Sequence, residues 1–211
     1  MMLGLLILAG GHSSRMGRDK AGLPFPNPDD PPLIRRVADG VSGVAGPPTI
    51  VGPVDYGTGW RLVSDEPGLS GPVAGLIAGL AASTSDLVLV LAADLPFPSP
   101  RLARELAKLA SREPESQAIV PERAGELEPL FAVYRRDALA DLREMARQLG
   151  RPGHGPSLYQ TVRAVRLRTV SESEWHAWDP EGDSFLNCNT PDELAAAVAR
   201  ARVRPNQGGY R

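Results

Sequence analysis

The segment 86–94, DLVLVLAAD, restricts the fold of this chain more than any other stretch. Between its two aspartates, leucine, valine and alanine follow one another without a polar residue. A run of this kind is typical of a strand that is covered on both faces, as in a parallel sheet between two layers of helices. The aspartate that ends the run, Asp94, is therefore expected at the carboxyl end of a buried central strand.

Apolar runs and helix-like segments alternate through the first half of the chain. This alternation predicts a mostly parallel, doubly wound α/β sheet. Pro72 fits the first turn of one predicted helix, where a missing N–H group costs little. Strands are predicted at 3–8, 47–52, 60–65 and 86–94, and helices at 33–44, 71–83 and 99–112.

The second half of the chain has a more mixed pattern, in which two strand-like runs follow each other directly. A length of 211 residues suits one domain. We place this domain at 1–203 and expect a flexible tail at 204–211. Strands are predicted at 117–122, 127–135 and, at an edge, 162–170, and helices at 137–150 and 189–203, the last capped by Thr190.

The bulk composition limits the kinds of partner that this chain attracts. A formal net charge of −2 gives no general attraction to nucleic acid or to an acidic membrane, so phosphate binding must be local. Cys188 is the only cysteine, which excludes an internal disulfide and fits a reducing cytoplasm. No segment reaches the ~18 apolar residues of a membrane span. We expect a cytoplasmic protein with no nucleic-acid or membrane partner.

The first predicted strand runs into the sequence GGHSSRMGRDK, in which glycines, serines and positive charge lie close together. Glycine lets backbone N–H groups approach an anion, and Arg15 and Lys20 add charge. This combination favours a nucleoside triphosphate over a single carboxylate. Its glycine spacing matches neither the Walker A loop nor the dinucleotide-binding fingerprint. A flexible turn with solvated charges is the alternative that these residues leave open.

Residues 8–20, LAGGHSSRMGRDK, closely resemble the signature of the molybdenum cofactor guanylyltransferases. That family belongs to the nucleotidyltransferases, so the resemblance implies a Rossmann-like, three-layer α/β/α fold. Relatives that use CTP usually carry Leu-Ala-Ala-Gly at this turn, whereas Gly10 here leaves room for a larger purine. The resemblance implies that the loop binds GTP and that Arg15 and Lys20 offset phosphate charge during catalysis. The GTP-binding residues it implies in this loop are Leu8, Ala9, Gly10, Gly11, Ser13 and Lys20.

Two aspartates follow predicted strands, where ligands of open α/β sheets bind. Asp94 lies in an Asp-x-Pro setting in which the family holds magnesium, and Mg²⁺ prefers one or two carboxylates together with substrate phosphates. We therefore expect Asp94 to bind Mg²⁺ and GTP and to take part in catalysis. Asp65 precedes a Gly-Pro-Val-Ala-Gly helix start that resembles the family's, which implies a contact with the nucleotide. A turn or cap residue is the alternative for each.

Two further segments carry weaker predictions. The sequence FLNCNTPDEL resembles the family's Asn-x-Asn-Thr-Pro motif, so Asn187 and Asn189 are expected near the metal or the acceptor phosphate. An ordinary helix entry explains the same residues. In the loop 151–157, Arg151 and His154 could meet an anionic acceptor, although a solvated loop histidine is favoured.

The resemblance implies a Mg²⁺-dependent transfer of GMP from GTP to the terminal phosphate of molybdopterin, with or without bound molybdenum. Transient contact with other enzymes of molybdenum cofactor synthesis is a further expectation of the same kind. Three alternatives are open. They are CTP with molybdopterin, GTP with a small phospho-acid, and a nucleotide-binding module without catalytic activity.

Overall fold

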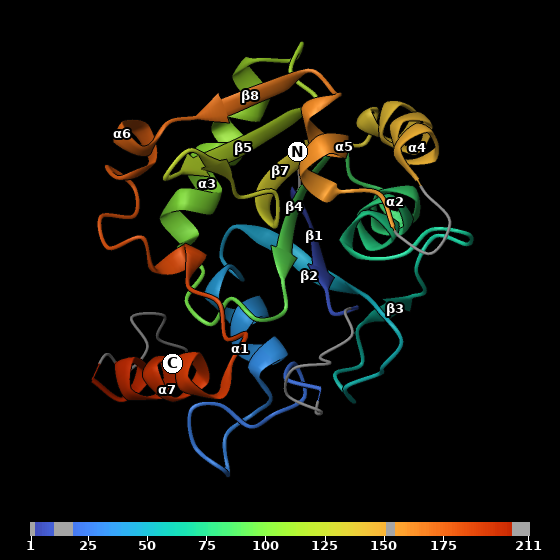
Figure 1. Cartoon of the computed structure of the whole chain (residues 1–211). Coiled ribbons are helices and arrows are strands. Elements are labelled where there is room, and N and C mark those ends of the chain that lie inside the picture. The colour runs from blue at the N-terminus through green and yellow to red at the C-terminus, as the bar shows by residue number, and fades with distance from the viewer. Residues whose placement is uncertain (1–2, 11–18, 151–154, 204–211) are drawn as a thin grey trace.

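The computed structural model of the protein describes residues 3–10, 19–150 and 155–203, and within them eight strands form one sheet (Figure 1). The strand order is β3-β2-β1-β4-β7-β5-β6, with β8 paired to β5. The strands are β1 (Leu3–Leu8), β2 (Ala45–Val51), β3 (Arg61–Val63), β4 (Leu87–Ala92), β5 (Ala118–Arg123), β6 (Glu126–Leu127), β7 (Phe131–Arg135) and β8 (Leu167–Val170).

The half of the sheet built from β3, β2, β1 and β4 is entirely parallel. Every residue of β4 is buried, as expected for the apolar run at its centre. Strands β1 and β4 pair in register from Gly4 opposite Val88 to Leu8 opposite Ala92. Because the two strands end side by side, the segments that follow them begin at the same edge of the sheet.

The other half of the sheet is mixed. β7 runs antiparallel to both β4 and β5, whereas β8 is parallel to β5. β5 turns into β6 through Ala124 and Gly125, both with positive φ, which is the usual geometry of a two-residue hairpin turn. The single strand predicted at 127–135 is wrong in detail. Around Pro129 it is interrupted by a turn in which Phe131 N donates to Glu128 O at 3.1 Å, so β6 and β7 are separate strands.

Helices cover both faces of the sheet, which confirms the three-layer α/β arrangement (Figure 1). One core cluster combines α1 and α3 with one face of β1 and β4, and a second combines α2, α4 and α5 with the opposite face. The helices are α1 (Leu33–Gly40), α2 (Pro72–Ala82), α3 (Pro100–Arg112), α4 (Ala138–Leu149), α5 (Leu158–Arg163), α6 (Glu172–Trp175) and α7 (Pro191–Val203).

The edge strand predicted at 162–170 is only partly correct. Its first residues belong to α5, which is capped by Ser157, and β8 begins only at Leu167. Leu158, Tyr159 and Val162 of α5 all contact the second core cluster, and their spacing of three and four residues fits a helix better than a strand. The helix predicted at 33–44 ends at Gly40.

The closing helix α7 begins as predicted, with Thr190 as its cap. The Glu193 amide donates to Thr190 Oγ1 at 3.2 Å, and the Glu193 carboxylate accepts from the Thr190 amide at 2.9 Å. This reciprocal arrangement is a capping box, which satisfies amide groups that a helix start otherwise leaves unpaired. The helix packs through Ala197 and Ala201 against a third cluster that contains Phe25 and Cys188.

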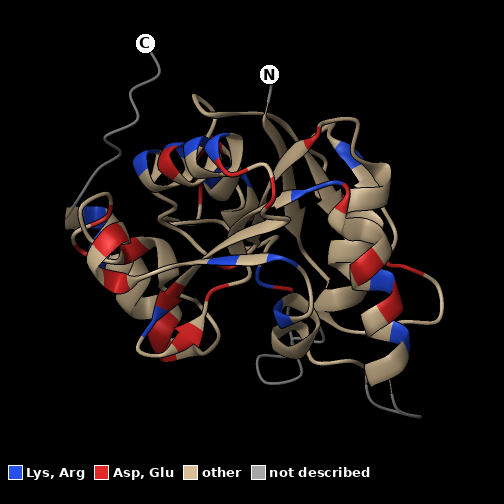
Figure 2. Ribbon diagram, turned by 90° about the horizontal axis from the view of Figure 1, so that it is seen from above, with Lys and Arg blue, Asp and Glu red and all other residues tan. Residues whose placement is uncertain are grey.

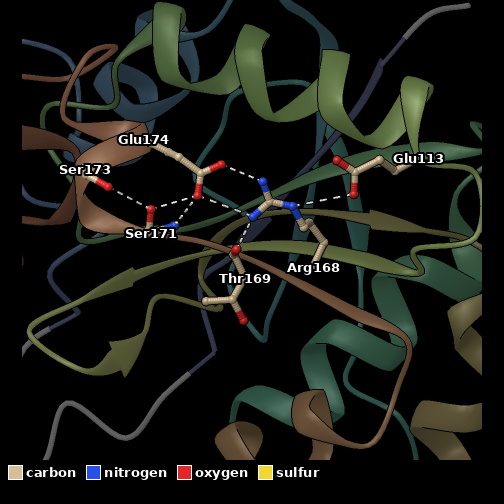
Figure 3. Close-up of polar contacts among 6 residues, drawn as sticks. All are labelled: Glu113, Arg168, Thr169, Ser171, Ser173 and Glu174. Carbon is tan, nitrogen blue, oxygen red and sulfur yellow. Dashed lines mark hydrogen bonds and ion pairs between the residues drawn. The ribbon is translucent and has the colours of Figure 1, made fainter.

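A network of charged side chains joins β8 to its neighbours at the far edge of the sheet (Figure 3). Arg168 on β8 pairs with Glu174 of α6 and with Glu113, which follows α3. Glu174 also accepts from the Ser171 amide at 2.9 Å, which completes a capping box for α6. These contacts lower the pKa of Glu174 to about 2, chiefly through its hydrogen bond with Arg168.

Acidic and basic residues are interspersed along the helices on both sides of the sheet (Figure 2). This distribution agrees with the small net charge expected from composition. Within the described parts of the chain, none of the helices combines the length and the apolar character needed to cross a bilayer.

Candidate active site

A pocket of about 260 Å³ opens where β1 and β4 end side by side. Backbone hydrogen bonds hold together the segments that line it. Ala93 N donates to Leu8 O and Ala92 N donates to Leu130 O, each at 3.0 Å. The pocket therefore lies at the carboxyl ends of the central parallel strands. It is lined by Leu8, Ala9, Gly10, Asp19, Lys20, Ala21, Pro72, Ala92, Ala93, Asp94, Leu130 and Asn189.

Three of the predicted site residues meet in this pocket from distant parts of the sequence. Lys20 Nζ donates to Asn189 Oδ1 at 3.2 Å. The Cys188 amide, next to Asn189, donates to the carbonyl of Asp94 at 3.1 Å. The pocket lining thus includes the ammonium group of Lys20, the carboxylate of Asp94 and the side-chain amide of Asn189.

The surroundings of Asp94 disfavour its charged form, as the direction of its pKa shift shows. Burial raises its pKa, while Lys20 opposes the rise and Glu193 adds to it. Among the described residues, no side chain donates a hydrogen bond to this carboxylate. The Asp94 backbone donates a hydrogen bond to the carboxylate, but partial burial still disfavours its charged form, so a cation or a ligand hydrogen bond at this place would be stabilising.

Asp65, also predicted to bind GTP, does not line the pocket; it lies beyond the end of β3 and is exposed. A Cβ atom placed on Gly10 or on Gly75 would lie 3.3 Å from one of its carboxylate oxygens. The space beside Gly10 is thus bounded by the Asp65 carboxylate. Partial burial raises the pKa of Asp65.

The loop that carries Asp65 is tied to the rest of the molecule through the next residue. Glu66 accepts two hydrogen bonds from Arg143 of α4, with Nε at 2.8 Å and Nη2 at 3.1 Å. The Glu66 amide donates to Ala74 O at 3.2 Å, which holds the loop against α2. These contacts position the Asp65 segment while leaving the Asp65 carboxylate itself accessible.

Several predicted site residues are not brought to this pocket by the described structure. Asn187 is exposed and is absent from the pocket lining, unlike Asn189. Gly11, Ser13 and Arg15 lie outside the described residues, as does His154. Their predicted roles stay predictions.

The structure adds pocket residues that sequence reasoning missed. Asp19 lines the pocket, and its carboxylate accepts from the Ala21 amide at 3.1 Å. The neighbouring Tyr56 has a raised pKa because of burial, to which Asp19 adds. The signal for Asp19 was its place directly before Lys20, whereas Pro72 and Leu130 reach the pocket only through the fold.

The pocket residues suit a metal ion that takes part of its coordination from the phosphates of a bound nucleotide. Within residues 3–10, 19–150 and 155–203, no cluster of three or more His, Cys, Asp or Glu residues could hold a metal. Asp94 supplies a single carboxylate with a raised pKa at the pocket. Mg²⁺ commonly binds through one or two carboxylates and completes its shell with water and substrate phosphates, so the residues present suit it.

Comparisons with known proteins show which sequences this chain is similar to. Residues 5–168 match the family model of the MobA-like NTP transferase domain. A protein of Chloroflexus aggregans named a probable molybdenum cofactor guanylyltransferase is 35% identical over 207 residues, covering 94% of this chain and 95% of its own length. The molybdenum cofactor guanylyltransferase of Desulfosudis oleivorans is 33% identical over 203 residues, with coverages of 94% and 95%.

Solved structures show the same fold. Molybdopterin-guanine dinucleotide biosynthesis protein A of Archaeoglobus fulgidus superposes with a TM-score of 0.78 at 22% identity, covering 95% of this chain and 100% of its own. The 2-C-methyl-D-erythritol 4-phosphate cytidylyltransferase of Thermus thermophilus gives a TM-score of 0.66 at 22% identity, with coverages of 96% and 100%. Both structures share the Rossmann-like layers, so the predicted fold class is confirmed.

Proposed function

This chain belongs to the family of MobA-like NTP transferases, and from this premise we propose that it transfers GMP from GTP to molybdopterin. The acceptor is the terminal phosphate of molybdopterin, with or without bound molybdenum. The products are pyrophosphate and the guanine dinucleotide form of the cofactor. The observation that carries the proposal is the meeting of Lys20, Asp94 and Asn189 in one pocket at the ends of the central strands.

The nucleotide base is assigned to the side of the pocket formed by Leu8, Ala9 and Gly10. This assignment follows the matching residues of the family signature, and the three residues line the pocket. The Asp65 carboxylate, which bounds the space beside Gly10, is close enough to that side to serve as a hydrogen-bond acceptor for the nucleoside. The triphosphate then extends toward Lys20.

Lys20 is assigned to the phosphates because its ammonium group lies in the pocket and carries a hydrogen bond that a ligand can replace. Nζ donates to Asn189, a neutral partner, so a phosphate oxygen would be a stronger acceptor. In the reaction, a phosphate oxygen of the acceptor forms a bond to the α-phosphorus. The bond to the bridging oxygen breaks and pyrophosphate leaves. Lys20 and Arg15 offset the charge that develops on the leaving group.

Asp94 is assigned to Mg²⁺, together with phosphate oxygens of GTP. When bound, the ion would neutralise phosphate charge and orient the triphosphate. The attacking phosphate is already an anion, so little general-base catalysis is required. Positioning and charge neutralisation therefore account for most of the expected rate enhancement.

The first experiment measures the melting temperature with GTP, CTP and ATP, each with and without Mg²⁺. A ligand present at 100 times its Kd stabilises the folded state by about 2.7 kcal/mol, which is easily measured. We expect a Mg²⁺-dependent shift with GTP that exceeds the shift with CTP or ATP. A larger shift with CTP would overturn the assignment of the base.

The second experiment tests the acceptor. GTP, Mg²⁺ and freshly prepared molybdopterin are incubated with the enzyme, and pyrophosphate and the dinucleotide product are quantified. The Asp94→Asn variant serves as the control for contaminating activities. Binding of GTP without pyrophosphate release would contradict the proposed acceptor and favour another phospho-acid or a binding module.

A further inference from the structure

Arg36 of α1 packs against a pair of aromatic rings, Phe25 and Phe97. Its Cζ atom lies 5.3 Å from the centroid of the Phe25 ring and 5.2 Å from that of Phe97. The two rings are themselves in edge-to-face contact, with centroids 6.2 Å apart. A cation over two aromatic faces gains from both, and each such contact is worth about 0.5–2 kcal/mol depending on exposure.

The two rings belong to the two segments that carry the charged residues of the pocket. Phe25 lies five residues after Lys20, and Phe97 lies three residues after Asp94. In addition, Arg36 Nε donates to the carbonyl of Pro96 at 2.9 Å. Arg36 therefore contacts both segments at once.

The segment after Lys20 is fixed to the same helix by its backbone. Ile34 N donates to Ala21 O at 3.0 Å, and Leu33 N donates to Leu23 O at 2.8 Å. The start of α1 thus satisfies its free amides with carbonyls of the segment that follows Lys20. Arg36, one turn further along the helix, adds the contact to the Asp94 side.

We propose that Arg36 is a positioning residue that sets the separation of Lys20 and Asp94, and so couples the binding of GTP to that of the divalent cation. This inference rests on the proposed function, because it assigns Lys20 to the phosphates and Asp94 to the metal. Arg36 itself lines no part of the pocket. It acts by joining the two segments whose side chains must contact the same triphosphate.

An arginine suits this place better than a lysine would. The guanidinium group is planar, so its faces pack on rings while its edge donates to a carbonyl. A lysine ammonium is a compact point charge on a flexible stem, and it cannot make all three contacts at once. Arg36→Lys should therefore keep the charge but lose much of the positioning.

The neighbouring Arg35 provides a matched control on the same helix. It also lies over an aromatic ring, with Cζ 5.3 Å from the centroid of Trp60, and it forms an ion pair with Asp39 at 3.3 Å. It makes neither the Pro96 hydrogen bond nor the contacts with Phe25 and Phe97. Arg35→Met therefore removes a comparable side chain without loosening the Lys20 and Asp94 segments.

The test measures the Kd of GTP by calorimetry with and without Mg²⁺, for the wild type, Arg35→Met, Arg36→Met and Arg36→Lys. The factor by which Mg²⁺ tightens GTP binding is the coupling. We expect this factor to fall about 10-fold in Arg36→Met, to fall less in Arg36→Lys, and to stay unchanged in Arg35→Met. A wild-type coupling factor in folded Arg36→Met would overturn the inference. If Arg36→Met does not fold, the same criterion is applied to Arg36→Lys.

A double variant separates positioning from a general loss of stability. If Arg36 acts through Asp94, then Arg36→Met combined with Asp94→Asn should show the same Mg²⁺ coupling as Asp94→Asn alone. A double variant in which the losses of Mg²⁺ coupling from Arg36→Met and Asp94→Asn add together would contradict an action of Arg36 through Asp94. If the wild type binds no GTP with or without Mg²⁺, the proposed function fails instead, so the two failures are distinguishable.

Discussion

The pocket and the β8–α6 edge hold carboxylates in opposite electrostatic states. In the pocket, burial raises the pKa of Asp94, and no described side chain donates a hydrogen bond to it. At the edge, Arg168 and the Ser171 amide lower the pKa of Glu174 to about 2 (Figure 3). The carboxylate at the edge has its partners within the protein, whereas the Asp94 carboxylate would gain from a ligand, and this contrast supports the proposal that the chemistry takes place in the pocket.

The strongest test of this contrast removes the pocket carboxylate. Asp94→Asn should reduce turnover by about 100- to 1,000-fold or more, because the proposed metal would lose its protein ligand. The measurement is pyrophosphate release at saturating GTP and Mg²⁺. Because Asp94 is costly when charged and buried, the nucleotide-free variant should melt no lower than the wild type at neutral pH. Turnover near the wild-type value would refute the assignment.

Removing the positive charge of the pocket should have the next largest effect. Lys20→Met should lower kcat/KM for GTP by about 10- to 100-fold, since a charge-assisted contact to phosphate is lost. Lys108→Met is the matched control, because Lys108 is exposed on α3 and pairs only with Glu105, at 2.7 Å. Equal activity of the two variants would exclude Lys20 from the phosphate site.

Asp65 lies outside the pocket lining and is exposed, so its replacement should have a milder effect. Asp65→Asn should weaken GTP binding by about 10-fold while kcat changes less, as expected for the loss of a hydrogen bond to the nucleoside. Calorimetry gives the Kd, and steady-state kinetics give kcat. A loss confined to kcat would instead assign Asp65 to the reacting phosphates.

The smallest effect is expected at the structural edge. Glu174→Gln should lower the free energy of unfolding by less than about 1 kcal/mol at neutral pH, because the pair with Arg168 is only partly buried. The pKa of Glu174 is lowered in the folded state, so its stabilisation is present above its unfolded pKa and is lost as the pH falls toward 2. Urea denaturation of both proteins should give stabilities that converge as the pH falls to about 2, with GTP binding at neutral pH unaffected.

The position of Asp94 at the end of a buried central strand could be predicted from local sequence signals. The apolar run before Asp94 predicted a buried central strand, and the loop after β1 predicted a phosphate site at the same sheet edge. The first prediction is confirmed because strand burial is a local property of the sequence, whereas the phosphate site stays a prediction. The family resemblance added Asn189, whose spatial neighbour Lys20 no local pattern could identify.

The parts that could not be predicted depend on contacts between distant elements. Leu130 and Pro72 reach the pocket through the pairing of β7 with β4 and the placement of α2. The strand predicted at 162–170 rested on apolar residues that alternate with polar ones, but its first two residues belong to α5, whose Val162 packs into the second core cluster. The ion pair of Arg143 with Glu66 has no signal in either local segment.

The hydrogen bond between Lys20 and Asn189 spans 169 positions in the sequence, and this has a consequence for how the protein is made. During synthesis the first strands emerge long before Asn189 leaves the ribosome, at rates of about 5–20 residues per second. The proposed nucleotide site therefore gains Asn189 only after all the described strands have been synthesised. A chain that stops before Asn189 would contain all eight of these strands but lack the partner to which Lys20 donates its hydrogen bond, so its sheet could form while the proposed site is still incomplete.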